Sequence, residues 1–329
     1  MRIPPPRVSV VVPLYNKVAW VGRCIRSVLT QDFQDFEVIV VDDGSTDGSV
    51  DAVRSLADDR IRVIARENGG AASARNVGFD AAAGEYIALL DADDEWRPEH
   101  LHALLAAMDW HGEAVLACDE WRGDGYSLAH VVAAAPMRAG SFGGTTVRFC
   151  AFDYLQNISA GRFVTSCSST MIRVAPLRSG NIRFDERMRR GEDVNFWIRL
   201  SRLGPYIYCD LQGAHYHRDD PRSEMIRQRH AAEPMPDYFL GVPRDSLDRT
   251  QRAQVRRFLR TEFLKNAYSN RGLPFDRGEM RMRTLQGHNL LVDAIYLGIR
   301  YLPRSLMGLV KMVRRGLART PVAGILSCC

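Results

Sequence analysis

Three aspartates follow directly on the apolar run Tyr86-Ile87-Ala88-Leu89-Leu90: Asp91, Asp93 and Asp94. A run of this composition predicts a buried strand. Carboxylates so close together repel one another and are costly to desolvate unless a cation shares their site. Two of them, spaced as Asp-x-Asp, supply the oxygen ligands that Mg²⁺ and Mn²⁺ prefer. The pattern is compatible with a divalent-metal site at the end of a strand. Taken alone, Asp-x-Asp is common and more often marks a solvated turn and helix cap before Pro98, so the metal site depends on the motifs that accompany it.

Strands and helices alternate through the first hundred residues and must position these carboxylates. Apolar runs predict strands over 8–12, 38–41 and 61–64, and helical spacing predicts helices over 21–29 and from Asn68-Gly69-Gly70 to Ala82. The first strand is expected to stop at Pro13, which cannot donate to a central ladder. Short connections between alternating elements predict an open, largely parallel α/β sheet, and such sheets bind ligands at the carboxyl ends of their strands.

The bulk composition excludes several classes of protein. With 329 residues, 46% hydrophobic and 25% charged, the chain is of ordinary globular type and long enough for a large domain with an appendage. No Gly-x-Gly-x-x-Gly follows the first strand and no Walker lysine loop occurs, which disfavours dinucleotide and P-loop sites. Seven scattered cysteines and the absence of a signal peptide in residues 1–7 predict a reduced, cytoplasmic protein.

Four ordered segments resemble the nucleotide-sugar half of family 2 glycosyltransferases, which have the GT-A fold. They are residues 8–16, 38–47, 68–76 and 89–94. The resemblance implies a Rossmann-like, mostly parallel mixed sheet flanked by helices. It also implies inverting transfer of a sugar from a nucleotide-diphospho-sugar, with a divalent cation, Mn²⁺ or Mg²⁺, as cofactor.

The resemblance assigns donor-binding roles to matched positions. Tyr15 can lie against a pyrimidine, and Asp43 can accept a hydrogen bond from the imide nitrogen of uracil. Arg75 can donate to phosphate oxygens, although it could also be an ordinary cation on a helix surface. Asn16 could contact ribose or form a local Asx-turn. The full donor-binding set is Pro13, Tyr15, Asn16, Asp43, Ser45, Gly70, Arg75, Asp91 and Ala92.

The resemblance also implies a metal site and a catalytic base. Asp91 and Asp93 match the family's Asp-x-Asp, with Asp93 as the direct metal ligand, and His217 matches a histidine near the diphosphate. The alternative is that His215 and His217 lie together only because residues alternate along a strand, and that neither is a metal ligand. Asp193, supported by Glu192, matches the base that takes the proton of the acceptor hydroxyl. Their alternative is a charged first turn that caps a helix.

The predicted domains are a GT-A catalytic domain over 1–232 and a basic, amphipathic helical extension over 233–329. The catalytic domain divides into a nucleotide-sugar half at about 8–110 and an acceptor half at about 111–232, with a loop-rich connection over 119–165. In the extension, residues 289–313 combine apolar and basic positions without forming a clean transmembrane segment. Two interpretations stay open: peripheral binding to the inner face of the cytoplasmic membrane, or a helical cap on the catalytic domain or on a second subunit.

The expected function is transfer of a sugar from UDP to a hydroxyl of a glycan or lipid-linked acceptor in cell-envelope polysaccharide biosynthesis. No nucleic-acid partner is expected, and the oligomeric state stays open. Three alternatives remain: a polyprenyl-phosphate sugar transferase, a nucleotidyltransferase, and a catalytically silent nucleotide-sugar-binding protein on the same fold.

Overall fold

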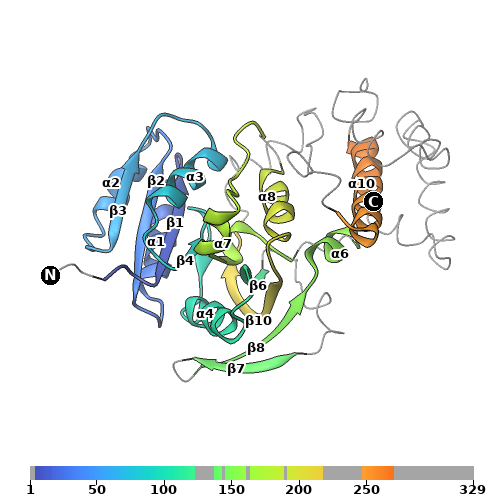
Figure 1. Cartoon of the computed structure of the whole chain (residues 1–329). Coiled ribbons are helices and arrows are strands. Elements are labelled where there is room, and N and C mark those ends of the chain that lie inside the picture. The colour runs from blue at the N-terminus through green and yellow to red at the C-terminus, as the bar shows by residue number, and fades with distance from the viewer. Residues whose placement is uncertain are drawn as a thin grey trace. The chain divides into compact units, whose positions relative to one another are not determined.

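The chain forms two compact units. The computed structural model describes residues 4–122, 137–142, 145–160, 164–188, 191–217 and 247–269. One unit comprises Met1–Tyr154 with Val164–Pro221, and the other Leu155–Phe163 with Arg222–Cys329 (Figure 1). Every candidate site residue belongs to the first unit. The domain boundary predicted near residue 232 lies outside the described residues.

A mixed sheet forms the centre of the first unit. Within the described residues it has ten strands, in the order β3-β2-β1-β4-β9-β6-β10-β8-β7, with β5 paired to β10. Their bounds are β1 Val8–Leu14, β2 Phe36–Asp42, β3 Ile61–Ala65, β4 Tyr86–Leu89, β5 Glu95–Trp96, β6 Leu116–Arg122, β7 Arg138–Phe142, β8 Thr145–Phe152, β9 Thr170–Arg173 and β10 Tyr206–His215.

Strand direction brings several loops to one edge of this sheet. Strands β1 to β4 are mutually parallel, as are β6 and β10, whereas β9 runs antiparallel between β4 and β6. The carboxyl ends of β1, β2, β4, β6 and β10 therefore meet at one rim. Because β9 runs the other way, its amino end and the residues before it arrive at the same rim.

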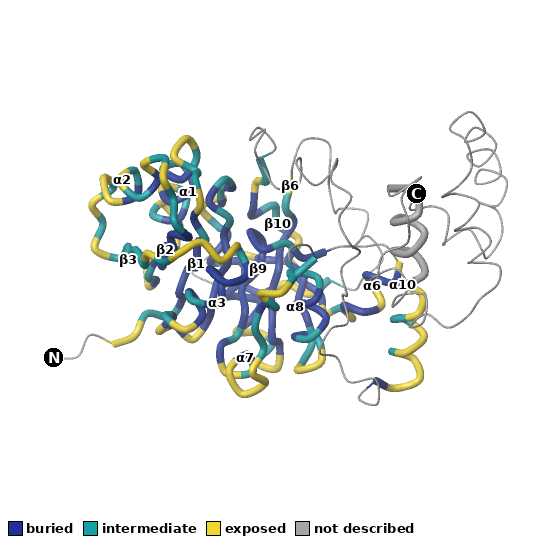
Figure 2. Tube along the Cα trace, turned by 90° about the horizontal axis from the view of Figure 1, so that it is seen from above, coloured by how far each residue is buried: buried dark blue, intermediate teal, exposed yellow. Residues whose placement is uncertain are grey.

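Helices cover both faces of the sheet. Helix α1 packs with α2 and α4 on one face, where its buried residues join the core formed by alternate positions of β1 and β2. Helix α3 covers the other face, and a Cβ atom at its Gly78 would overlap the side chain of Val11. Figure 2 shows α1 and α2 on one side of β1 and β2, with α3 on the other. The bounds in this unit are α1 Val21–Leu29, α2 Ser49–Arg54, α3 Ala71–Ala81, α4 His100–Trp110, the 3₁₀ turn η1 Cys167–Ser169, α7 Val174–Ser179 and α8 Glu192–Leu200.

The predicted strands and helices of the front half are confirmed, with one wrong boundary. Strand β1 continues through Pro13 to Leu14, whose carbonyl accepts the N–H of Asp43 at 2.8 Å. The ladder between β1 and β4 ends at the pair Val11–Leu89, so beyond that point β1 is paired only with β2. A missing N–H on the open side costs no ladder hydrogen bond, and proline is tolerated there.

The loop-rich connection predicted over 119–165 is wrong for most of its described residues. They form the end of β6, the antiparallel pair β7–β8 and helix α6 (Tyr154–Ser159). Gly140 lies inside β7, where a Cβ atom would come within 2.8 Å of the Phe149 ring. This glycine therefore permits close packing between strands and does not mark a loop. Strand β10 was not predicted. It ends at His215, so His217 lies just beyond the strand, but the two imidazole rings lie together as the alternative predicted, with centroids 4.3 Å apart.

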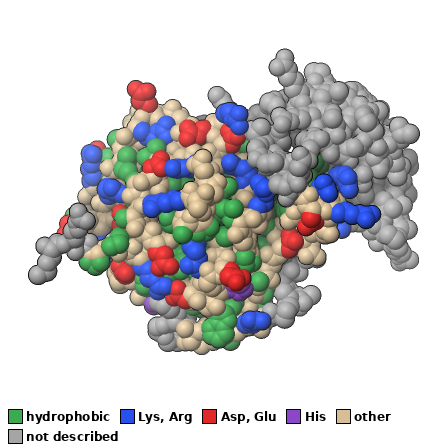
Figure 3. Space-filling model, in the orientation of Figure 1, with side chains coloured by type: hydrophobic (Ala, Val, Ile, Leu, Met, Phe, Trp, Pro, Cys, Tyr) green, Lys and Arg blue, Asp and Glu red, His purple; other side chains and the backbone are tan. Residues whose placement is uncertain are grey.

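In the second unit, helix α10 (Arg249–Ser269) confirms the amphipathic helix predicted around residue 258. Phe258 and Leu259 are buried, whereas Arg256 and Arg257 are exposed. Residues 289–313, on which the membrane interpretation depends, lie outside the described part of the chain. Where the structure is described, it contains no helix with the length and apolar character needed to cross a bilayer. On the face drawn in Figure 3, Lys and Arg are interspersed with Asp and Glu.

Candidate active site

The loop after β4, residues 91–94, is the acidic loop of the site. It turns tightly, since the N–H of Asp94 donates to the carbonyl of Asp91 at 3.0 Å. Cations from two other elements neutralise its first two carboxylates. Nη2 of Arg75, from α3, lies 2.7 Å from Oδ1 of Asp91, and Nζ of Lys17, from the loop after β1, lies 2.5 Å from Oδ2 of Asp93. The rim of the sheet thus gathers acidic and basic groups from three segments.

Ser168 forms hydrogen bonds with two residues of the acidic loop. Its hydroxyl accepts the N–H of Asp91 at 3.1 Å and donates to Oδ2 of Asp94 at 2.5 Å. The residue lies in η1, immediately before the antiparallel strand β9, and that strand direction brings it to the rim. Asp94 is 1% exposed, so it serves as an internal anchor of the loop and is not open to a ligand.

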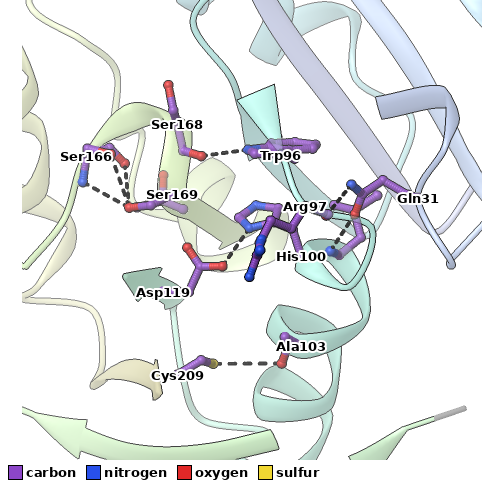
Figure 4. A network of polar contacts seen from close by, with 12 residues as sticks. Gln31, Trp96, Arg97, His100, Ala103, Asp119, Ser166, Ser168, Ser169 and Cys209 are labelled. Carbon is purple, nitrogen blue, oxygen red and sulfur yellow. Dashed lines mark hydrogen bonds and ion pairs between the residues drawn. The ribbon is translucent and has the colours of Figure 1, made fainter. Parts of the chain in front are cut away.

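A buried column of side chains continues from Ser168 away from the rim (Figure 4). Trp96 donates through Nε1 to the carbonyl of Ser168 at 2.6 Å, and its ring stacks on His100 with centroids 4.3 Å apart. Nδ1 of His100 lies 2.6 Å from Oδ2 of Asp119, and both side chains are fully buried. The column joins β5, α4 and β6, and so connects the acidic loop to the core between α4 and β6.

Burial disfavours the ionised forms of the carboxyl groups in the acidic loop, so a nearby cation would stabilise them. Desolvation raises the pKa of Asp93 above its usual range, although Lys17 opposes that shift. Desolvation, followed by repulsion from Asp91 and Asp93, raises the pKa of Asp94 well above its usual range. A cation near these groups favours their ionised forms.

Two loops of the donor side are tied to each other. The N–H of Asn16 donates to Oγ of Ser45 at 3.0 Å, and the N–H of Thr46 donates to Oδ1 of Asn16 at 2.8 Å. The Asn16 side chain thus bridges the loops after β1 and β2, and the alternative of a local Asx-turn is wrong. Tyr15, next to it, is 49% exposed, which leaves its ring accessible.

Asp43 lies at the end of β2 and is 2% exposed. Its carboxylate accepts the N–H of Gly69 at 3.0 Å and that of Gly70 at 2.7 Å, and Nε of Arg66 lies 3.2 Å away. Gly70 has φ +89°, a conformation that favours glycine. Asp43 therefore anchors the amino end of α3. Its contact with a nucleotide base stays a prediction.

Arg75 is buried, and the alternative of a cation on the helix surface is wrong. Its side chain is 6% exposed and lies over the Phe184 ring at 5.2 Å. Besides Asp91 it contacts Glu192, with Nη1 3.4 Å from Oε1. One guanidinium therefore joins the acidic loop to the first turn of α8.

Asp193 follows Glu192 at the start of α8, after Gly191 with φ +69°. Oδ1 of Asp193 accepts the N–H of Val194 at 2.7 Å. Burial raises the pKa of its carboxyl, the nearby Arg75 lowers it, and Asp91 raises it further. The two predicted acidic groups at the helix start are thus placed beside the acidic loop, through their shared neighbour Arg75.

His217 is engaged by other residues of the rim. Its Nε2 lies 2.9 Å from Oε1 of Glu95, which also pairs with Nε of Arg23 at 2.5 Å, and its N–H donates to Asp94 at 3.2 Å. Burial lowers the pKa of His217, and Arg23 and His215 lower it further. Its role as a metal ligand stays a prediction.

The chemistry of the carboxylates determines how a metal ion would fit. In the part of the chain that the structure describes, no group of three His, Cys, Asp or Glu side chains converges on one point. Mg²⁺ sites in phosphate-handling enzymes use one or two protein carboxylates and complete their shell with substrate phosphates and water. Asp93, with Asp91 beside it, fits a site of this kind.

Sequence reasoning missed Lys17 and Ser168. Lys17 directly follows Asn16 after a strand that ends at the ligand-binding rim, and that position was a usable signal. Ser168 gave no such signal, because the sequence shows a strand near 170 without its direction.

The model of the family described as Glycosyl transferase family 2 matches residues 9–178. The chain belongs to this family. ExoO of Rhizobium meliloti (strain 1021), a succinoglycan biosynthesis protein, is 35% identical to this chain over 240 residues. The matched residues cover 68% of this chain and 65% of ExoO. The chain spans from about a quarter to two thirds of the length of the curated relatives that it matches.

Two solved structures share the fold. TarS of S. aureus in complex with UDP-GlcNAc has a TM-score of 0.57 at 19% identity, covering 98% of this chain and 89% of that one. The mannosyltransferase PcManGT of Pyrobaculum calidifontis, in complex with GDP-Man and Mn²⁺, has a TM-score of 0.50 at 17% identity, covering 98% and 84%. The expected GT-A fold is thereby confirmed.

Proposed function

We propose that this protein is an inverting glycosyltransferase that moves a sugar from a nucleotide-diphospho-sugar, UDP-linked, to an acceptor hydroxyl in glycan assembly. The observation that carries the proposal is the double contact of Arg75. It places the acidic loop, expected to bind the donor diphosphate, beside the helix that carries the candidate base. Direct displacement requires both groups at one reacting centre.

Residues at the rim have distinct parts in this reaction. Tyr15 and the tied loops after β1 and β2 receive the nucleoside, and Arg75 keeps Asp91 oriented at the edge of the diphosphate site. A divalent cation held by Asp93, with Asp91 beside it, would neutralise charge on the diphosphate leaving group.

Asp193 accepts the proton of the attacking hydroxyl. A carboxylate whose pKa is raised by burial is a stronger base than an exposed one. The hydrogen bond from the N–H of Val194 fixes one of its oxygens, which leaves the other for the acceptor. A single carboxylate is sufficient for inversion, because the displacement occurs in one step.

The neighbours support a nucleotide-sugar donor and leave the nucleotide to experiment. TarS was crystallised with UDP-GlcNAc and PcManGT with GDP-Man and Mn²⁺. We favour uridine because the segments that carry Tyr15 and Asp43 are adjacent, with the N–H of Asp43 donating to the carbonyl of Leu14, and because an aromatic ring suits the face of uracil and a carboxylate its imide. The relationship to ExoO supports a setting in polysaccharide biosynthesis.

A panel of UDP-, GDP- and dTDP-sugars tests the proposal. Donor hydrolysis and thermal shift are measured with Mn²⁺ or Mg²⁺ and again with a chelator. We expect a response to UDP-sugars that the chelator abolishes. A response to GDP-sugars alone would refute the uridine assignment, and the absence of any response to the panel would refute the proposed donor class.

Product analysis separates the proposal from its alternatives. Incubation with polyprenyl phosphate and a responding donor would yield a polyprenyl-phosphate sugar if phosphate oxygen were the acceptor. Release of pyrophosphate in place of a nucleoside diphosphate would indicate a nucleotidyltransferase. A silent binding protein would bind the donor without turnover, and its biological role would survive Asp193→Asn.

A further inference from the structure

Lys17 forms an ion pair with Asp93, the carboxylate proposed as the direct ligand of the metal ion. Nζ of Lys17 is 2.5 Å from Oδ2 of Asp93, and the two side chains are 19% and 18% exposed. The backbone of Lys17 is fixed, because its N–H donates to Oγ of Ser49 at 2.8 Å. Its ammonium also lies 5.5 Å from the centre of the Trp20 ring. A cation of the protein itself thus already compensates Asp93.

The two cations of the acidic loop differ in how firmly they are held. Arg75 is buried, and its planar guanidinium contacts Asp91 and Glu192 at the same time. Lys17 is a point charge on a flexible four-carbon stem, and it starts from a loop at the rim. Of the two, Lys17 therefore has the side chain that can move away from its carboxylate more readily.

We propose that Lys17 is a displaceable counter-ion of Asp93. While its ammonium occupies this carboxylate, Lys17 excludes divalent cations until the donor diphosphate binds. The inference rests on the proposed function, since it concerns the same metal site. A univalent and a divalent cation repel each other at one carboxylate, so Mn²⁺ must displace the ammonium to bind Asp93. The diphosphate removes this conflict, because its negative charge compensates both cations. Metal and donor therefore bind with positive coupling, and each increases the affinity of the other.

The deciding experiment measures the binding of Mn²⁺ alone to the full chain by electron paramagnetic resonance, without donor. Lys17→Met keeps the length of the side chain and removes its charge, and we expect Mn²⁺ to bind roughly tenfold more tightly than to the wild type. Lys17→Arg keeps the charge and should bind Mn²⁺ as weakly as the wild type. Arg23→Met is the matched control for a nearby charge, because Arg23 pairs with the carboxylate of Glu95 and donates to the backbone carbonyl of Asp93.

A second arm adds UDP. In the wild type, UDP should increase the affinity for Mn²⁺ by a larger factor than in Lys17→Met, because the variant has no ammonium to displace. Asp93→Asn should lose the tight Mn²⁺ site in both backgrounds.

The outcomes separate this inference from the proposed function. If Lys17→Met binds Mn²⁺ no more tightly than the wild type, or if Arg23→Met gains as much, the counter-ion role of Lys17 is wrong. If at the same time Asp93→Asn weakens binding, the metal site itself survives. If no variant binds Mn²⁺, or if Asp93→Asn binds it as the wild type does, both the inference and the proposed metal site are wrong.

Discussion

Nη2 of Arg75 lies 2.7 Å from Oδ1 of Asp91, and this contact fixes the first carboxylate of the acidic loop to helix α3. Through Nη1 the same guanidinium reaches Glu192 in the first turn of α8. Arginine stays charged at all accessible pH values. Two carboxylates from distant parts of the sequence are therefore compensated by one permanent buried cation, and Arg75 is as important for the architecture of the site as for any contact with substrate.

Arg75→Met should destabilise the protein by about 3–5 kcal/mol, because it removes the buried cation that Asp91 and Glu192 share. Urea denaturation measures the change. Arg54→Met is the matched control: Arg54 is 66% exposed in a pair with Asp51, and its loss should change the free energy of unfolding by less than about 0.5 kcal/mol. Adding Glu192→Gln to Arg75→Met should restore part of the stability. Equal unfolding midpoints for the wild type and Arg75→Met would contradict this account.

Asp193→Asn should lower kcat by about 10²- to 10⁴-fold while nucleotide binding persists, because the amide cannot accept the proton of the acceptor. Glu192→Gln, which leaves the base in place, should lower kcat far less. Donor binding is checked by calorimetry and turnover by release of the nucleoside diphosphate. A variant that keeps turnover would exclude Asp193 as the base.

The pH profile of the wild type provides a separate test of Asp193. Its pKa is raised by burial, so the base is protonated and inactive at low pH, and kcat/KM should rise with pH through a value above the usual range of aspartate. The groups that face it are Arg75, Asp91, Glu192, Cys167 and Tyr154. In Asp193→Asn this acidic limb should disappear from the residual activity. A limb that persists there belongs to another group.

Much of the donor half could be predicted from the sequence, because its signals are local. Apolar runs and helical spacing located β1 to β4, α1 and α3, and helix α1 has the predicted bounds of 21–29. The acidic loop and the Glu192-Asp193 pair could also be predicted from the sequence. The loop directly follows the apolar run of β4, and the pair begins the amphipathic helix α8. That the two groups lie together was implied by the family resemblance alone. No local pattern shows it, since it depends on the path of Arg75 through the core.

The acceptor half was harder to predict, because its determinants are contacts between distant segments. Gly140 and Gly213 are glycines inside strands, where neighbouring side chains leave no room for a Cβ atom, and a local pattern cannot distinguish them from turn residues. The sequence does not show that β9 runs antiparallel to its neighbours. The contact of Ser168 with the acidic loop depends on that direction, so it could not be predicted either. The position of Lys17 after a rim strand was a usable signal, but its pairing with Asp93 depends on the proximity of two loops, which no local pattern shows.

Ser168→Ala should weaken binding of Mn²⁺ and UDP together, because it removes the hydroxyl that joins the N–H of Asp91 to the carboxylate of Asp94. Loss of these hydrogen bonds should also reduce stability by about 1–3 kcal/mol. Ser169→Ala is the matched control: this neighbouring hydroxyl is equally buried but contacts Ser166 within the 3₁₀ turn. We expect Ser169→Ala to reduce stability without affecting ligand binding. If both variants bind UDP and Mn²⁺ alike, Ser168 has only a structural role.

Gly213→Ala should prevent or strongly impair folding, because its Cβ atom would overlap Oδ2 of Asp119 and approach Nδ1 of His100. These atoms belong to a fully buried pair at the base of the column that supports the acidic loop, so neither can swing out to solvent. Overpacking in a rigid core costs about 1–3 kcal/mol and more where backbone must shift, and we expect at least about 3 kcal/mol by urea denaturation. Gly112→Ala is the control, since no atom lies within 4 Å of its added Cβ. Equal stability of the two variants would show that the His100–Asp119 pair can rearrange, and the column would then not be the rigid support of the acidic loop.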